Sequence, residues 1–258
     1  MLGALADDAE AYHQTTGCLL HPAYLPAQYA FLQRADPAAE RSIRRITDVG
    51  GYLYRVWFAG PAPMSLSVAS WSGLLASARR DWHWDYARLL LGDNLAEKLP
   101  PLADFDAAQT GLREDYAARW PQLRDCPFFL ALGDGAAANV GSGAVDDSRI
   151  ALTIGTTSAL RVVKDIERVP AGLWRYLVTA DMPLVGGATS EGGNVYQWVM
   201  EDQLLAGVQL EAQLAARQPD AHGLTVLPLL AGERAPGWRA ASCASSWTPA
   251  SSWSSITH

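Results

Sequence analysis

The pattern of apolar and polar positions changes near residue 125. Before that point, apolar residues recur at helical spacing, and Asp36-Pro37 separates the first two of these stretches. The helical stretches are "PAQYAFLQRA" (26–35), "AERSIRRITDVGGYLYRVWF" (39–58) and "DWHWDYARLLLGDN" (81–94), and "FDAAQTGLREDYAARW" (105–120) predicts a turn that leads into a further helix. The pattern therefore predicts a mostly helical region from residue 1 to about residue 125.

After about Pro127 the chain consists of short apolar or alternating runs separated by Gly-rich turns, which is the pattern of strands. The predicted strands are "FFLAL", "RIALTI", "ALRVV", "WRYLVTA" and "LTVLPLL". Two predicted helices, "GGNVYQWVMEDQLL" and "LEAQLAARQ", interrupt them. Strands mixed with helices on this scale predict an α/β domain with a central sheet.

Composition narrows the class of protein. The chain has 258 residues, 49% hydrophobic and 18% charged, which is typical of a folded chain that can bury a substantial core. A net charge of -7 argues against a nucleic-acid partner and favours a small soluble one. No apolar run is long enough to span a membrane, and the start has no basic region typical of a signal peptide. Three distant cysteines fit a reduced, cytoplasmic protein. No pattern indicates an oligomeric state.

The last 18 residues, 241–258, differ from the rest of the chain. They contain seven serines and two tryptophans, and no Asp, Glu, Lys or Arg. Tryptophan is unusual in a solvated Ser-rich linker. We interpret this tail as non-native coding, such as a frameshift that ends the chain early, with a natural linker as the alternative.

Common catalytic motifs are absent from the sequence. There is no P-loop, no H-E-x-x-H and no G-x-S-x-G, so metal-centred and serine hydrolysis have no support. Three Gly-centred turns remain: "GDGAAANVGSG" with Asp134, Gly155–Ser158 between two predicted strands, and Gly186-Gly187 at the end of a predicted strand. Small residues and a helix N-terminus let backbone N–H groups approach an anion closely. Together, the three turns indicate a phosphate site.

Each turn alone has a simpler explanation. Gly155–Ser158 is the pattern of a β-hairpin tip, and Gly186-Gly187 permits close packing of a strand against a helix. Asp134 alone is a good N-cap for the helix that "AAAN" predicts.

The order of these segments resembles the FGGY carbohydrate kinases, in particular the gluconokinase and xylulokinase branch. The resemblance covers about residues 10–240. The segments that carry it are "TGCLLHPAYLPAQYAFL", "SLSVASWSGLL", "LGDGAAANVGSG", "IGTTSALR", "GGATSEGGNVYQW" and "LPLLAGERAPGW". It implies an actin-like ATPase (ribonuclease H-like) α/β fold of two domains, incomplete at both ends. Residues 1–125 would be the remnant of the N-terminal domain and 126–240 the first part of the C-terminal domain, followed by the atypical tail 241–258.

The resemblance also implies an activity, which is ATP-dependent phosphorylation of a hydroxyl on a sugar or sugar acid. Asp134 matches the family's catalytic base, and Asp134 and Gly135 would contact the substrate. Cofactor contacts would come from a phosphate hairpin, Gly155, Thr156 and Thr157, and from a nucleotide-binding turn, Gly186, Gly187 and Ala188. Mg²⁺ would accompany ATP, held mainly by phosphates and water rather than by protein ligands.

The sequence also departs from the family's pattern. No acidic Asp-x-Gly-Thr-like loop precedes Tyr12, and the chain lacks the family's continuation after "GERAPGW". Gln28 and Phe31 stand where the family commonly has Lys and Trp. The expectation is therefore a carbohydrate kinase impaired by truncation. The alternatives are a non-catalytic remnant with at most weak nucleotide or sugar binding, and an actin-like ATPase or scaffold unrelated to sugars.

Overall fold

The protein divides into two compact units, and the chain passes between them more than once. The first unit comprises Met1–Ala151 and Arg161–Gly186, and the second comprises Leu152–Leu160 and Gly187–His258. The computed structural model describes residues 3, 5, 7–58, 60–93, 95–202, 210–219, 221, 232, 234, 235, 237 and 238. The predicted domain boundary between residues 125 and 126 stays a prediction, and the tail 241–258 lies outside the described residues.

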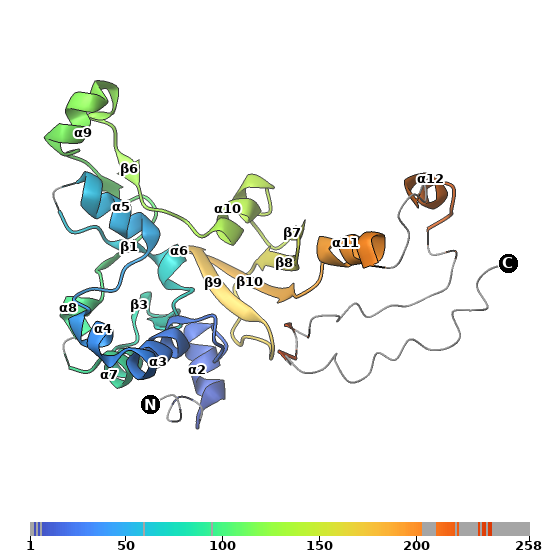
Figure 1. Ribbon diagram of the computed structural model, residues 1–258, viewed down its shortest axis with the longest axis horizontal. Helices are drawn as coiled ribbons and strands as arrows, with labels where there is room; N and C mark the ends of the chain where they lie inside the picture. The colour runs from blue at the N-terminus through green and yellow to red at the C-terminus, as the bar shows by residue number, and fades with distance from the viewer. Residues whose placement is uncertain are drawn as a thin grey trace. The chain divides into compact units, whose positions relative to one another are not determined.

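Helices dominate the early part of the chain (Figure 1). They are α2 (Ala9–Thr16), α3 (Leu25–Ala35), α4 (Pro37–Ser42), α5 (Val49–Trp57), α6 (Leu66–Ala69), α7 (Trp84–Leu91), α8 (Leu95–Lys98), α9 (Glu114–Arg119), the 3₁₀ helix η1 (Pro121–Leu123) and α10 (Asp134–Gly141). Two helices come later in the chain, α11 (Gly193–Asp202) and α12 (Leu210–Ala215). Side chains of Asp8, Asp36 and Asp48 cap the N-termini of α2, α4 and α5. Each such cap stabilises its helix by about 1 kcal/mol.

The predicted helix over residues 39–58 was wrong in its middle. The chain leaves the helix after Ser42 and starts a new one at Val49, whose N-terminus Asp48 caps. Between them, the Ile46 N–H donates to the Lys98 carbonyl at 2.8 Å. A hydrogen bond to a distant residue thus replaces the helical one, because tertiary contacts outweigh the weak local preference.

The long strands occur after residue 149, and the earlier strands have two residues each. In the part of the chain that the structure describes, the strands are β1 (Met64–Ser65), β2 (Leu75–Ala76), β3 (Asp81–Trp82), β4 (Leu102–Ala103), β5 (Ala108–Gln109), β6 (Phe128–Phe129), β7 (Ile150–Ile154), β8 (Ser158–Val163), β9 (Trp174–Thr179) and β10 (Met182–Thr189). The predicted strands "RIALTI", "ALRVV" and "WRYLVTA" are confirmed as β7, β8 and β9. "FFLAL" forms only the two-residue β6, and "LTVLPLL" lies outside the described residues.

The main sheet has four strands in the order β7-β8-β10-β9. β9 and β10 pair antiparallel, with Leu184 opposite Tyr176 and Gly186 opposite Trp174. Their register shifts between Met182 and Pro183, and proline lacks the N–H that a regular ladder would use. β10 extends as far as Thr189 and so includes Gly186 and Gly187, where the sequence predicted the end of a strand.

The core of the first unit joins the early helices to the late strand β9. It is a cluster of buried side chains: Tyr29, Met64, Leu66, Ala69, Leu74, Leu75, Trp82, Ala87, Leu90, Leu91, Leu99 and Leu177. Leu177 comes from β9, and α6 packs against that strand. Full burial of one leucine is worth about 1.5–3 kcal/mol, so this cluster accounts for much of the unit's stability.

Helix α2 is fastened to the segment around β9 by polar contacts. The His13 Nε2 lies 2.7 Å from the Leu173 carbonyl oxygen, and the Gln14 amide exchanges two hydrogen bonds with the Val169 backbone. The helix ends at Gly17, whose φ is +73°, and the Gly17 carbonyl accepts a hydrogen bond from the Arg175 N–H at 2.9 Å. The close approach at Gly17 thus anchors α2 against β9.

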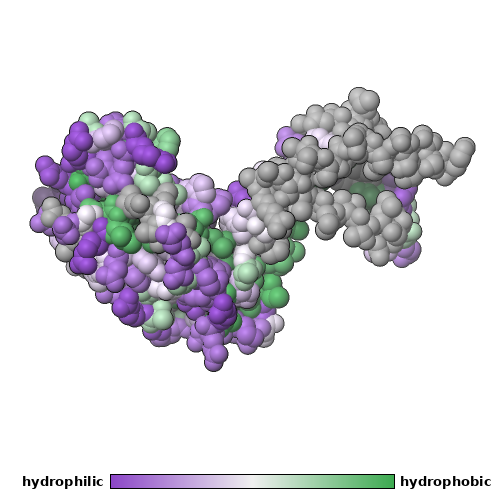
Figure 2. Space-filling view, turned by 90° about the horizontal axis from the view of Figure 1, so that it is seen from below, coloured by the Kyte–Doolittle hydropathy of each residue, from purple (hydrophilic) through white to green (hydrophobic). Residues whose placement is uncertain are grey.

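On the face seen in Figure 2, the coloured residues are largely polar, with separate hydrophobic areas. Exposed large apolar side chains include those of Phe31, Ile150 and Ile154. Among the described residues, no helix combines the length and the hydrophobicity needed to cross a bilayer.

Candidate active site

Asp134 is the first residue of α10. The preceding Gly133 occupies the N-cap position in an extended conformation and provides no side-chain cap. The Asp134 Oδ1 accepts a hydrogen bond from the Gly135 N–H at 2.6 Å, and the side chain is exposed. The alternative interpretation of Asp134 as the N-cap was therefore wrong. The carboxylate lies at the positive end of a helix dipole and is open to a ligand.

Gly135 is buried beneath the side chain of Arg161, which extends from β8 in the same unit. A Cβ atom added at Gly135 would lie 2.9 Å from the Arg161 Nε. Glycine at this position thus lets a guanidinium approach the first turn of α10. Sequence reasoning missed Arg161, because nothing in the strand pattern of "ALRVV" indicates which residue its side chain meets.

The predicted hairpin is confirmed. Gly155, Thr156 and Thr157 form the connection between β7 and β8, and the Gly155 N–H donates to the Thr157 carbonyl at 2.9 Å. Gly155 and Thr156 are exposed. The tip is therefore accessible to a ligand, as a phosphate-binding hairpin requires.

Within the second unit, this hairpin tip contacts the start of α11. The Gly193 N–H donates to the Gly155 carbonyl at 2.6 Å, and the Asn194 N–H donates to the Thr156 carbonyl at 3.4 Å. A Cβ atom at Gly192 would lie 2.7 Å from the Gly155 oxygen and 2.8 Å from the Thr157 carbonyl carbon. Gly192 and Gly193 are thus the residues that allow the hairpin and the helix N-terminus to meet.

The structure corrects the predicted nucleotide-binding turn. Gly186, Gly187 and Ala188 lie inside strand β10, because the chain stays extended as far as Thr189. Gly186 pairs with Trp174 of β9, and the Ala188 carbonyl accepts a hydrogen bond from the Ala235 N–H at 2.9 Å. Their role in nucleotide binding stays a prediction.

The candidate residues belong to different units, so each set is described by itself. Asp134, Gly135 and Gly186 belong to the first unit. Gly155, Thr156, Thr157, Gly187 and Ala188 belong to the second. The structure brings the hairpin tip together with the N-terminus of α11, a contact that the sequence alone did not indicate.

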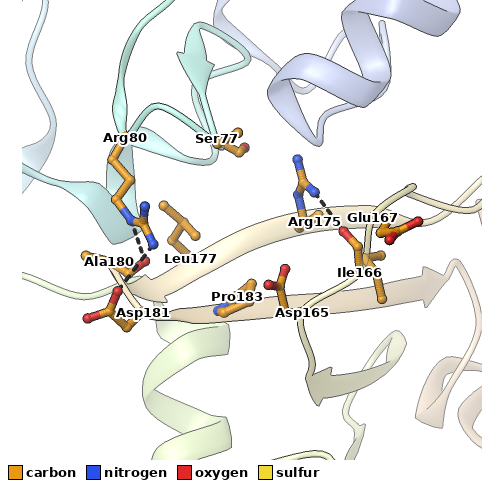
Figure 3. A pocket seen from close by; sticks show the side chains of 11 residues that line it. Ser77, Arg80, Asp165, Ile166, Glu167, Arg175, Leu177, Ala180, Asp181 and Pro183 are labelled. Carbon is orange, nitrogen blue, oxygen red and sulfur yellow. Dashed lines mark hydrogen bonds and ion pairs between the residues drawn. The ribbon is translucent and has the colours of Figure 1, made fainter.

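A cavity of about 490 Å³ in the first unit contains none of these residues (Figure 3). It lies over β9 and β10, and its lining includes Arg80, Arg175, Asp165, Glu167 and Asp181. The Arg80 guanidinium bonds to the Ala180 carbonyl and to Asp181, and Arg175 donates to the carbonyls of Ile166 and Gln14. Both cations are thus engaged by oxygen atoms of the protein, and the other charges are acidic. The cavity does not resemble a phosphate site.

Among the residues that the structure describes, no cluster of His, Cys, Asp and Glu could hold a metal ion. The donors around the hairpin are backbone N–H groups and hydroxyls instead. Such groups suit the phosphates of a nucleotide, and the Mg²⁺ that accompanies ATP is commonly bound through phosphates and water.

No protein-family model matches the sequence. The chain is 24% identical over 242 residues to the gluconokinase of Bacillus subtilis, covering 88% of this chain and 46% of that protein. It is 27% identical over 150 residues to the xylulose kinase of Escherichia coli, covering 58% of this chain and 30% of that protein. The chain thus spans about half the length of the gluconokinase it matches.

Solved structures share the fold of the chain. The fold matches a gluconate kinase from Lactobacillus acidophilus with a TM-score of 0.81 at 21% identity, covering 93% of this chain and 50% of that one. It matches a xylulose kinase from Rhodospirillum rubrum with a TM-score of 0.79 at 19% identity, covering 96% of this chain and 52% of that one. The predicted actin-like α/β fold is therefore confirmed. The chain is a homologue of the gluconokinases and xylulose kinases of the FGGY family, and it has the fold of about half of such a kinase.

Proposed function

We propose that this chain is a carbohydrate kinase, which transfers the γ-phosphoryl group of ATP to a hydroxyl of a sugar or sugar acid. The observation that carries the proposal is the exposed Asp134 carboxylate at the first residue of α10 in a chain with this fold. The names of the related proteins, gluconokinase and xylulose kinase, support the substrate class.

In this proposal, Asp134 is the general base. Its carboxylate accepts the proton of the attacking hydroxyl while the hydroxyl oxygen bonds to the γ-phosphorus, and the bridging oxygen leaves with ADP. Phosphoryl transfer needs little covalent help from a protein, so positioning and charge stabilisation account for most of the catalysis. An exposed carboxylate that caps no helix is suited to this role, because it can reach a substrate hydroxyl.

The names of the relatives support a sugar acid over a neutral sugar as the acceptor. Two gluconokinases match the chain over 242 and 244 residues, whereas the xylulose kinase of Escherichia coli matches it over 150. Gluconate is therefore the acceptor we expect to be preferred.

The hairpin and the start of α11 hold the phosphates of ATP. Gly155 and Thr156 are exposed at the tip, and the tip is fastened to α11 by the bond between Gly193 and Gly155. The first N–H groups of α11 are engaged by the hairpin carbonyls, so the donors proposed for the phosphates are the hydroxyls of Thr156 and Thr157, and the N-terminal end of the α11 dipole favours the negative charge. Mg²⁺ supplies charge neutralisation at the phosphates when bound, and no residue of the chain is assigned to it as a ligand.

The direct test is an assay of the purified chain with Mg²⁺ and ATP against gluconate, xylulose and glycerol, with ADP release and phosphorylated product both measured. We expect ADP release that depends on one of these acceptors, with gluconate preferred. Calorimetry with ATP gives the second measurement. Nucleotide binding without turnover would favour the non-catalytic alternative, and the absence of both binding and turnover would reject a kinase.

Replacing Gly192 by alanine should weaken ATP binding about tenfold. The added Cβ would lie 2.7 Å from the Gly155 oxygen and 2.8 Å from the Thr157 carbonyl carbon, and neither backbone atom can swing aside. Relieving the overlap therefore has to move the hairpin tip, at about 1–3 kcal/mol, which corresponds to about 5- to 140-fold in Kd if the whole cost falls on binding. Calorimetry of the variant with Mg²⁺ and ATP measures the change.

Gly60→Ala is the matched control, since a Cβ there meets no atom within 4 Å. It should bind ATP like the unmodified chain. Equal ATP affinity in Gly192→Ala would contradict the assignment of the hairpin to phosphate binding.

A further inference from the structure

The backbone that leads into Asp134 is held by side chains rather than by a strand ladder. Residues 130–133 belong to no helix or strand. The Ser65 Oγ donates to the Ala131 carbonyl at 2.6 Å, and the Gly133 N–H donates to the Ser67 Oγ at 3.2 Å. Both serines are almost completely buried. Gly133 is buried, so its N–H group needs a partner, which the Ser67 hydroxyl provides, and the buried Ser65 hydroxyl holds the loop at the exposed Ala131.

Ser65 has two functions through one hydroxyl. Besides donating to Ala131, its Oγ accepts a hydrogen bond from the Val68 N–H at 3.1 Å and so caps α6. The start of α6 and the approach to Asp134 are thereby joined at a single oxygen atom.

Trp71, just after α6, provides a third contact. Its indole ring lies so close to Gly133 that a Cβ atom there would be 2.2 Å from the Trp71 Cζ2. The ring thus limits movement of the residue immediately before Asp134.

The α6 segment is itself anchored to the main sheet. The Leu177 N–H of β9 donates to the Ser70 Oγ at 3.0 Å, and that hydroxyl donates to the Ser67 carbonyl at 2.6 Å. Hydrogen bonds thus connect β9 to Ser67 through Ser70, and the other oxygen atom of Ser67, its Oγ, accepts from the Gly133 N–H.

We propose that the segment Ser65–Trp71 is a positioning platform that fixes the Asp134 carboxylate for proton transfer. The proposal rests on the proposed function of Asp134 as a base. Ser65, Ser67 and Trp71 are positioning residues, because they act through the loop and not on the substrate. A base misplaced by about 1 Å loses about a hundredfold in rate, so a loop with no ladder of its own needs such support.

The test compares variants of the full chain that separate the cap from the loop contact. Ser65→Asp keeps an acceptor for the Val68 N–H but has no proton to donate to Ala131, whereas Ser65→Thr keeps both bonds. Ser67→Ala removes the acceptor of the Gly133 N–H. Ser42→Ala is the control, since it removes a hydroxyl that donates to a backbone carbonyl (Ala39) on the exposed α4.

Two readouts are needed. Amide hydrogen exchange of residues 133–135 should be about tenfold faster in Ser65→Asp and Ser67→Ala, and unchanged in Ser65→Thr and Ser42→Ala. In the acceptor-dependent assay, kcat should fall about 10- to 100-fold in the first two variants with KM unchanged, and Ser65→Thr should retain the original kcat.

Unchanged exchange at residues 133–135, or faster exchange there with full kcat, would overturn the proposal. If Ser67→Ala loses protection from hydrogen exchange throughout the chain, Ser67 contributes to folding in general. The comparison of Ser65→Asp with Ser65→Thr then decides whether the proposal holds. A lack of turnover in the unmodified chain would reject the proposed function instead, and local exchange would still decide whether the platform holds the loop.

Discussion

Replacing Asp134 by asparagine should lower kcat for phosphoryl transfer by about a thousandfold while the Kd for ATP stays the same. Asparagine has nearly the same shape, but its amide cannot take the proton of the attacking hydroxyl, and general-base catalysis contributes about 10²- to 10⁴-fold. The carboxylate is exposed and caps no helix. Loss of its negative charge should therefore lower the free energy of unfolding only by the favourable interaction with the α10 dipole, about 0.3–1 kcal/mol. Steady-state kinetics and calorimetry measure the two quantities.

Asp106→Asn serves as the control for this prediction, since it removes an exposed carboxylate from another part of the chain. It should leave both quantities unchanged. Turnover at the original rate in Asp134→Asn would remove Asp134 from the proposed mechanism.

The second large effect concerns stability. Gly17→Ala should lower the free energy of unfolding by about 2–5 kcal/mol, because two costs add. Gly17 has a φ of +73°, where a side chain costs about 1–2 kcal/mol, and a Cβ atom there would lie 2.0 Å from the Arg175 carbonyl oxygen. Overlap with a backbone oxygen has to be relieved by moving α2 away from β9. Thermal unfolding should show Tm lowered by about 2–4 °C per kcal/mol.

Gly92→Ala separates the conformational cost from the cost of the overlap, since Gly92 has a φ of +77° with no atom within 4 Å of an added Cβ. It should pay the conformational cost alone. Equal losses of stability in both variants would contradict the prediction, because they would mean that the overlap with the Arg175 carbonyl oxygen is relieved at no cost.

The sequence predicted the elements whose determinants are local. The hairpin around Gly155 is confirmed because a glycine turn separates two apolar runs that pair with each other. Helices α3 and α7 begin where the apolar spacing predicts them, within a few residues. Such elements depend on neighbouring residues, which a sequence pattern records.

The errors occurred where distant residues decide the structure. The extended course of Gly186 depends on its pairing with Trp174, and the break before α5 depends partly on Lys98. The sequence predicted a turn at Gly186 and Gly187, but pairing with β9 keeps this part of the chain extended within β10. Arg161 over Gly135, and Ser67 bonded to Gly133, join residues far apart in sequence, and no local pattern indicates either pair.

The attachment of α2 to β9 also affects how the chain folds during synthesis. His13 bonds to Leu173 across 160 positions, and Gln14 bonds to Val169 across 155. Helix α2 therefore leaves the ribosome long before these partners exist, and the entropy of closing a loop of this length has to be overcome before those contacts form. The first unit cannot complete its packing until about residue 186 has emerged. Until then, the side chains of α2 that are buried in the folded unit stay exposed to solvent. We therefore expect chaperone binding to protect the nascent protein most during this interval.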